Sequence, residues 1–220
     1  MRWRRICIDG TNIVSKPTRT SRSWLDRQER DPYVQMARRD GWRSRAVYKL
    51  EQIDAKERLL RPDMVCVDVG SAPGSWSQYV TRKLKGRARI VAIDILPMDS
   101  LPDVEFIQGD FQDDAVFEQL LQAIGDEGAD LVMSDIAPNS TGTRVVDQPR
   151  SMYLVELALD LAKRVLKPGG SFICKVFQGE GIDDFVIETR RYFKRVKVMK
   201  PKASRAGSRE VYLVARNIQL

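Results

Sequence analysis

The spacing of apolar and polar residues along this chain of 220 residues predicts a regular alternation of strands and helices. Short blocks rich in Val, Ile and Phe are typical of strands that are buried in a sheet. These blocks end near Val69, Ile93, Gln108, Met133 and Phe177. Between them, apolar residues recur at helical spacing over about 74–84, 113–124 and 152–166. This alternation predicts an α/β fold of the Rossmann-like kind, with a mostly parallel sheet and helices on both faces.

The last part of the chain continues the pattern less regularly. The Lys-Pro-Gly-Gly run at 167–170 predicts the end of the long helix, and a strand over 171–177 follows it. The remaining elements are a helix and two short strands, expected over 182–193, 196–199 and 210–215.

Two helices are expected before the first strand. A cap-like Asp31 followed by a proline predicts a helix that Gly41 stops, and a second helix follows over about 44–54. Residues 1–30 are rich in Arg, Ser and Thr and have little periodicity. We therefore expect a flexible basic arm over 1–30 and a single domain over 31–220.

The first strand leads through a glycine turn into a helix. Residues 65–76 read Val-Cys-Val-Asp-Val-Gly-Ser-Ala-Pro-Gly-Ser-Trp, with Gly70 and Gly74 in the turn. This succession forms a ligand cradle, because glycine lets a ligand approach the backbone and the helix N-terminus offers free N–H groups. The Gly-x-Gly-x-x-Gly spacing of dinucleotide-binding dehydrogenases is absent, so a nicotinamide cofactor is disfavoured.

Acidic residues lie at the ends of the first three strands. Asp68 precedes the turn, Asp94 closes the second strand and Asp110 follows the third. One such Asp is about as often a helix cap or a turn former. Three at one edge of a sheet favour a nucleoside that carries positive charge over one that carries phosphates. S-adenosylmethionine, whose sulfonium is cationic, fits this description.

Composition narrows the possible chemistry. Histidine is absent, which removes imidazole bases, Ser-His-Asp triads and nearly all zinc sites, so we expect no metal. Cys7, Cys66 and Cys174 each have apolar neighbours, and we expect reduced, buried thiols. No apolar stretch is long enough for a membrane span or shaped like a signal peptide. We expect a cytoplasmic monomer.

Charge is unevenly distributed along the chain. The net charge of +7 divides into +7 over residues 1–63, −9 over residues 64–189 and +9 over residues 190–220. An acidic centre suits a cationic cofactor, and basic ends suit a polyanion such as RNA, although a basic surface is often only solvated. The basic residues expected to bind RNA are Arg43, Arg45, Lys194, Lys197, Lys202, Arg205 and Arg209.

Five segments carry a resemblance to a known family. They read Arg-Ser-Arg-Ala-Val-Tyr-Lys-Leu from Arg43, Asp-Val-Gly-Ser-Ala-Pro-Gly-Ser-Trp-Ser-Gln from Asp68, Met-Ser-Asp-Ile-Ala-Pro-Asn from Met133, Val-Phe-Gln-Gly-Glu-Gly from Val176 and Ser-Arg-Ala-Gly-Ser-Arg-Glu-Val-Tyr from Ser204. From Trp24 to Ala215 the sequence resembles the FtsJ/RrmJ family of ribosomal RNA 2′-O-methyltransferases. It is most similar to the bacterial members, which methylate a uridine ribose in the A loop of large-subunit (23S) ribosomal RNA.

The resemblance implies a seven-stranded methyltransferase sheet whose last strand is antiparallel. It also implies a catalytic tetrad at Lys49, Asp135, Lys175 and Glu210. Contacts to S-adenosylmethionine are implied at Gly74, Trp76, Asp94, Asp110 and Asp135, and the cradle adds Gly70. Ser75 departs from the family pattern, which has a second glycine there. The implied partner is ribosomal RNA or the large ribosomal subunit.

Lys175 is the least ordinary residue of the tetrad. It lies in Phe-Ile-Cys-Lys-Val-Phe, where burying an ammonium is costly unless partners compensate it. Two roles fit: a general base for the ribose hydroxyl, or an ammonium that positions this hydroxyl and stabilises developing oxyanion charge.

Two other functions fit parts of the sequence. An RNA base methyltransferase can share the fold, but cytosine C5 chemistry needs an exposed cysteine, and the segment Asp-Ile-Ala-Pro-Asn from Asp135 lacks the aromatic platform common in amino-group methylation. A non-catalytic factor of ribosome assembly could retain a nucleoside pocket and bind RNA, but it would not need the full tetrad.

Overall fold

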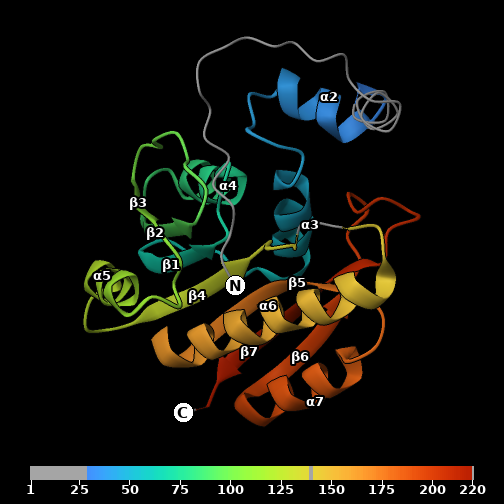
Figure 1. The fold of residues 1–220 in the computed structure, drawn as a ribbon. Coiled ribbons are helices and arrows are strands. Elements are labelled where there is room, and N and C mark those ends of the chain that lie inside the picture. Colours follow the sequence, from blue (N-terminus) through green and yellow to red (C-terminus); the bar gives the residue numbers. More distant parts are fainter. Residues whose placement is uncertain (1–28, 139–140, 220) are drawn as a thin grey trace, which may run out of the picture.

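The computed structural model describes residues 29–138 and 141–219, so most of the expected arm and Cys7 lie outside the described part. Its strands are β1 (Met64–Val69), β2 (Ala88–Asp94), β3 (Val104–Gln108), β4 (Ala129–Ser134), β5 (Leu166–Phe177), β6 (Phe193–Met199) and β7 (Glu210–Ile218). They form one seven-stranded sheet in the order β3-β2-β1-β4-β5-β7-β6 (Figure 1). The first five in this order are parallel, and β7 is antiparallel to both neighbours. The expected fold class is confirmed.

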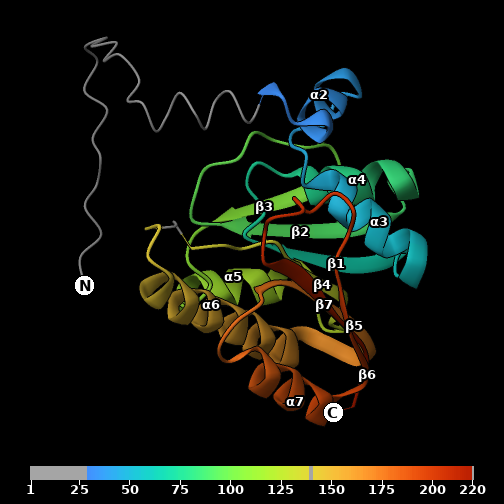
Figure 2. The same ribbon diagram turned by 90° about the vertical axis from the view of Figure 1, so that its right-hand side faces the viewer.

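Helices cover both faces of the sheet (Figure 2). They are α2 (Pro32–Arg39), α3 (Val47–Glu57), α4 (Ser75–Leu84), α5 (Asp114–Ile124), α6 (Arg144–Val165) and α7 (Ile182–Tyr192). Side chains of α3 and α4, including Leu50 and Val80, form one apolar cluster with the sheet. Side chains of α5, α6 and α7, including Leu120 and Phe185, form a second cluster on the opposite face. Strand residues alternate between the two clusters, which is why the central strands β1 and β4 contain few polar positions.

Of the expected boundaries, two differ most from those of the structure. The long helix begins at Arg144, before the expected start at Met152, and it contains Pro149. Pro149 is the sixth residue of α6 and has no N–H to donate to the backbone oxygen of Val145, so the sequence before Met152 does not indicate a helix. The strand expected from Ser171 begins at Leu166, which pairs with Ala129 of β4. The Lys-Pro-Gly-Gly run is therefore an irregularity inside β5, where the register with β4 shifts.

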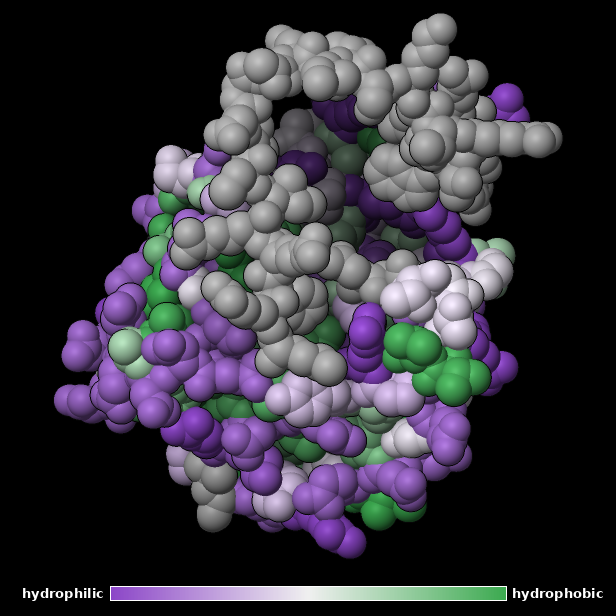
Figure 3. Space-filling model, in the orientation of Figure 1, coloured by the Kyte–Doolittle hydropathy of each residue, from purple (hydrophilic) through white to green (hydrophobic). Residues whose placement is uncertain are grey.

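The described surface is mostly polar. Figure 3 shows hydrophilic residues over most of the described part of one face, with smaller hydrophobic patches among them. One exposed apolar side chain is that of Val145 in the first turn of α6, which is 83% exposed. No helix within the described ranges is long and apolar enough to cross a membrane. Cys66 and Cys174 are free and buried, as expected for these two thiols.

Candidate active site

The four residues of the expected tetrad meet at the carboxyl end of the parallel strands. Lys49 lies in the first turn of α3, Asp135 directly follows β4, Lys175 belongs to β5 and Glu210 begins β7. These strands are neighbours in the order β4-β5-β7. Three segments that are distant in sequence therefore bring their functional groups to one place, and α3 adds the fourth from the side.

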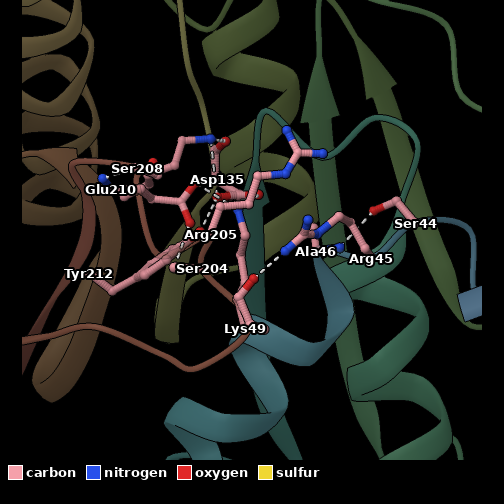
Figure 4. Close-up of polar contacts among 12 residues, drawn as sticks. Ser44, Arg45, Ala46, Lys49, Asp135, Ser204, Arg205, Ser208, Glu210 and Tyr212 are labelled. Atoms are coloured by element: carbon pink, nitrogen blue, oxygen red, sulfur yellow. Dashed lines mark hydrogen bonds and ion pairs between the residues drawn. The ribbon is translucent and has the colours of Figure 1, made fainter. Parts of the chain in front are cut away.

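The tetrad forms a chain of alternating charges, and Figure 4 labels three of its members, Lys49, Asp135 and Glu210. Lys175 Nζ lies 3.1 Å from Asp135 Oδ1, and it also donates to the backbone oxygen of Asp135. Lys49 Nζ lies 3.8 Å from Asp135 Oδ2 and donates to Glu210 Oε2 at 2.8 Å. The four side chains are 7 to 19% exposed. The charges are thus largely shielded from water while the cluster remains accessible to a ligand.

Tyr212 is a fifth member of the site that the sequence did not identify. Its hydroxyl donates to Asp135 Oδ1 at 2.6 Å, and its ring lies 5.6 Å from Lys49 Nζ. A tyrosine in a strand reads as a core residue, and Tyr212 is indeed fully buried. The available signal was its spacing, because residues two apart in a strand share a face and Glu210 had already been assigned to the site.

The surroundings of Asp135 hold it ionised. Burial alone would raise the pKa of its carboxyl, but the ammonium groups of Lys175 and Lys49 and the Tyr212 hydroxyl outweigh burial and lower this pKa. Burial, reinforced by the charge of Asp135, raises the pKa of Tyr212 well above its ordinary value. The tyrosine is therefore a hydrogen-bond donor, and Asp135 is the acceptor.

The glycine turn has no room for larger residues. Gly70 has φ of +71°, and an added Cβ would lie 2.0 Å from the Ile136 side chain. Gly74 caps α4 with φ of +95°, and an added Cβ would lie 2.7 Å from Met98 Sδ and 2.9 Å from Arg43 Nη1. At Gly70 the missing side chain lets the turn pack against Ile136, the residue after Asp135. At Gly74 the side chains of Met98 and Arg43 occupy the corresponding space.

The side chains of the other expected cofactor residues, Trp76, Asp94 and Asp110, lie in three different environments. The Trp76 indole is buried and donates to the backbone oxygen of Ala46 at 2.9 Å, so only its backbone is available to a ligand. Asp94 accepts from the backbone N–H groups of Ala72 and Leu96, each at 2.8 Å, and so ties the turn to β2. Asp110 is exposed beyond β3.

Negative charge is concentrated at this end of the sheet. Burial raises the pKa of the Asp68 carboxyl to about 7, and the charges of Asp135 and Asp94 add to the effect, although two hydrogen bonds from Ser77 oppose it. The carboxyl groups of Asp68, Asp94 and Asp135 therefore interact electrostatically across the cradle. A pocket of about 370 Å³, lined by Arg43, Pro73, Pro97, Met98 and Asp99, opens beside the turn.

The two arginines expected near the site are engaged within the protein. Arg43 donates to the backbone oxygens of Pro73, Asp99 and Ser100 at 2.7 to 2.9 Å, which joins the turn to the loop after β2. Arg45 is only 15% exposed and forms an ion pair with Asp31.

The five remaining basic residues do not form one group. Lys202 and Arg205 are exposed in the loop before β7, and Arg209 donates to the backbone oxygen of Gln178. Lys197 pairs with Glu57 at 2.7 Å. Lys194 lies where β6 pairs with the far end of β7, which is roughly 20 Å along the strand from Glu210. Lys194 is thus separated from the tetrad.

Comparison with known proteins identifies the family. The model of the FtsJ-like methyltransferases matches residues 42–218. The chain belongs to this family. Two bacterial relatives, both named "Ribosomal RNA large subunit methyltransferase E", are similar over nearly their full length. The FtsJ-like chain is 57% identical to the protein of Pseudomonas aeruginosa over 202 residues, covering 92% of this chain and 98% of the relative. It is 54% identical to that of Pseudomonas fluorescens over 198 residues, covering 90% and 95%.

Solved structures agree with this fold. A putative ribosomal RNA methyltransferase from Plasmodium falciparum matches with a TM-score of 0.70 at 31% identity, over 80% of this chain and 98% of that one. Human methyltransferase-like protein 13, solved in complex with SAH, matches with a TM-score of 0.55 at 19% identity, over 78% and 79%, and shows likeness of fold alone.

The FtsJ-like chain uses S-adenosylmethionine as its methyl donor, and the cradle fits this cofactor. The absent side chain of Gly70 lets the turn pack closely against Ile136, beside Asp135. The carboxyl groups of Asp94 and Asp135 lie at the cradle, and the negative charge of Asp135 suits a sulfonium cation.

Proposed function

We propose that this FtsJ-like methyltransferase transfers a methyl group to the 2′-oxygen of a uridine ribose in large-subunit ribosomal RNA. The observation that carries the proposal is the alternating chain of two lysines and two carboxylates beside the glycine turn. The printed names of the two Pseudomonas relatives, which align over nearly their full length, support ribosomal RNA as the substrate.

The tetrad suits alignment of a hydroxyl better than abstraction of its proton by a strong base. When bound, S-adenosylmethionine supplies an electrophilic methyl group on its sulfonium. An ammonium has three N–H donors, so Lys175 can keep its contacts with Asp135 and also hold the ribose oxygen in line, where it stabilises developing negative charge. Asp135 orients Lys175 and the hydroxyl. As the oxygen–methyl bond forms and the methyl–sulfur bond breaks, the hydroxyl proton becomes strongly acidic and passes to the Asp135 carboxylate, which can accept it even though its pKa is lowered.

Lys49 and Glu210 complete the site as a second ion pair at 2.8 Å. In this proposal Lys49 keeps the Asp135 carboxylate from rotating away, and Glu210 holds Lys49 in reach of it. We further propose that the cofactor is held by the backbone of the turn between Gly70 and Trp76 and by the carboxylates of Asp94 and Asp110. The exposed position of Asp110 leaves it available for such a contact.

RNA lies, in this proposal, across the basic surface around the loop before β7. Lys202 and Arg209 border that surface, and Arg43 and Arg45 stand behind it as supports of the site. We place the target in the A loop, the substrate in the assembled or late-assembling large subunit, and the enzyme in the cytoplasm as a monomer. Phosphate contacts by such residues supply affinity, while the tetrad supplies the chemistry.

Base methylation through a cysteine nucleophile is disfavoured by the structure. Cys66 and Cys174 are fully buried, and burial raises the pKa of both thiols. A thiolate is the reactive form, so neither can serve in the cytosine C5 reaction within the described part of the chain.

The test is transfer of a labelled methyl group to large ribosomal subunits from cells that lack the enzyme, with protein-free ribosomal RNA as the matched second substrate. A 2′-O-methyl group protects the adjacent phosphodiester from alkali. We expect one label, at an alkali-resistant uridine, and more of it on subunits than on free RNA. Label on a base, with every linkage still cleaved by alkali, would overturn the ribose assignment.

A further inference from the structure

The carboxylate of Asp31 performs two tasks at the start of α2. Its Oδ1 accepts from the backbone N–H of Tyr33 at 3.1 Å and so caps the helix. Its Oδ2 forms ion pairs with Arg45, which precedes α3, and with Nε of Arg205 at 3.2 Å in the loop before β7. The Asp31 side chain is only 8% exposed. A cap needs one oxygen, so the second is committed to joining two distant segments.

This junction connects directly to the tetrad (Figure 4). Arg45 also donates to the backbone oxygen of Ala203, in the same loop as Arg205. The next residue, Ser204, donates through its hydroxyl to Glu210 Oε1 at 2.7 Å. The other oxygen of Glu210 accepts from Lys49. A continuous path of polar contacts thus runs from the arginines through the 201–208 loop to the ammonium of Lys49.

Electrostatics explains why this path depends on Asp31. Arg45 is largely buried, and burial together with the nearby charge of Arg205 lowers its pKa. Two guanidinium groups that face one carboxylate would repel each other without it, and Arg45, the more buried of the two, would keep only the charge of Glu210 as compensation. Arg205, with 46% of its side chain exposed, is the partner that could swing into solvent. Its departure would leave the 201–208 loop held to this side of the protein only through Ala203, which contacts Gln52 of α3 and Arg45.

We propose that Asp31 is a positioning residue for methyl transfer, because its carboxylate clamps the two arginines and thereby fixes the loop that orients Glu210 and Lys49. The inference rests on the catalytic roles proposed for Glu210 and Lys49. It assigns Arg45 and Arg205 to the support of the active site, where the sequence had suggested contact with RNA.

Two substitutions at Asp31 separate positioning from helix capping. Asn is as good an N-cap as Asp but carries no charge, whereas Glu keeps the charge and caps poorly. In single-turnover assays with saturating cofactor and RNA, we expect Asp31→Asn to slow methyl transfer about 10-fold, with the affinity for S-adenosylmethionine unchanged. Asp31→Glu is expected to stay within about 3-fold of the wild type, since its longer carboxylate still reaches the arginines. Normal turnover in Asp31→Asn with slow turnover in Asp31→Glu would reduce Asp31 to a helix cap and overturn the proposal.

A second variant keeps the proposal testable if Asp31→Asn does not fold. Arg205→Gln changes a half-exposed side chain, and we expect the same loss of single-turnover rate. The double variant with Asp31→Asn and Arg205→Gln is expected to be no slower than the slower single variant, because both substitutions break the same contact between Asp31 and Arg205. Losses that multiply would mean that Arg205 acts elsewhere, for example on RNA, and would overturn the clamp.

Lys49→Ala serves as the reference that separates this proposal from the proposed function. A large loss with Lys49→Ala but normal rates for Asp31→Asn and Arg205→Gln would remove the clamp and leave the tetrad standing. A normal rate with Lys49→Ala would remove the tetrad assignment itself.

Discussion

Replacing Tyr212 by Phe removes one hydroxyl and leaves the buried ring in place. The hydroxyl oxygen lies 2.6 Å from Asp135 Oδ1, and its donor is protonated because burial raises the pKa of Tyr212. A hydrogen bond to a charged group contributes about 1.5 to 3 kcal/mol. Asp135 is 19% exposed and keeps Lys175 at 3.1 Å, so we expect the lower end of this range, about 1.5 kcal/mol. If the whole effect reaches the transition state, the rate falls about 10-fold.

The assay for Tyr212→Phe is single-turnover methyl transfer, accompanied by denaturant unfolding of the same variant. Tyr48→Phe is the matched control, since its hydroxyl donates to the carboxylate of Asp40 at 2.9 Å, away from the tetrad. We expect both variants to lose stability and only Tyr212→Phe to lose rate. Equal rates for the two variants and the wild type would refute the reasoning, because the hydroxyl would then hold the fold and not the reacting groups.

Three further predictions concern the cradle and the RNA surface. In the folded chain Asp68 keeps its proton up to about pH 7, whereas in the unfolded chain it loses this proton near pH 4. The free energy of unfolding of the wild type therefore falls as pH rises from 4 to 7, by up to about 1.4 kcal/mol per pH unit. The unfolding free energy of Asp68→Asn relative to the wild type should therefore rise from pH 4 to 7; a difference that is constant with pH would contradict this. Arg43→Met should weaken the binding of S-adenosylmethionine about 10-fold by calorimetry, because its guanidinium joins the turn to the loop after β2; unchanged affinity would exclude this role. Lys202→Gln should lower the slope of log affinity for RNA against log salt concentration by about 0.7 to 0.9, and an unchanged slope would leave Lys202 as ordinary solvated surface.

The strand ends and their acidic residues could be predicted because they depend on local pattern. Buried strands leave few positions for charge, so Lys175 inside β5 stood out in the sequence, whereas Asp135 at the end of β4 was assigned through the family resemblance. The start of α6 could not be found in this way, since Pro149 falls within the helix and interrupts the expected signal. The early start of β5 depends on pairing with β4, which periodicity does not reveal.

The partners of the basic residues could not be predicted, because they come from distant parts of the chain. Arg45 and Arg43 read as exposed cations suited to RNA. In the structure Arg45 pairs with Asp31 and Arg43 with backbone oxygens of the cradle. Backbone acceptors carry no signature in the sequence. The position of Asp31 at a helix start was already explained by its role as an N-cap, so nothing indicated a second role.

The measurement that tests the central claim most directly is the single-turnover rate of Lys175→Ala with saturating cofactor and RNA. Lys175 contacts both the carboxylate and the backbone oxygen of Asp135, at the centre of the tetrad. We predict a rate at least about 100-fold below that of the wild type, with the affinity for S-adenosylmethionine retained, because the cradle is built from other strand ends. Lys175→Arg, which keeps the positive charge, should recover part of the rate. A near-normal rate in Lys175→Ala would contradict the account, and Lys175 would then be only a structural partner of Asp135.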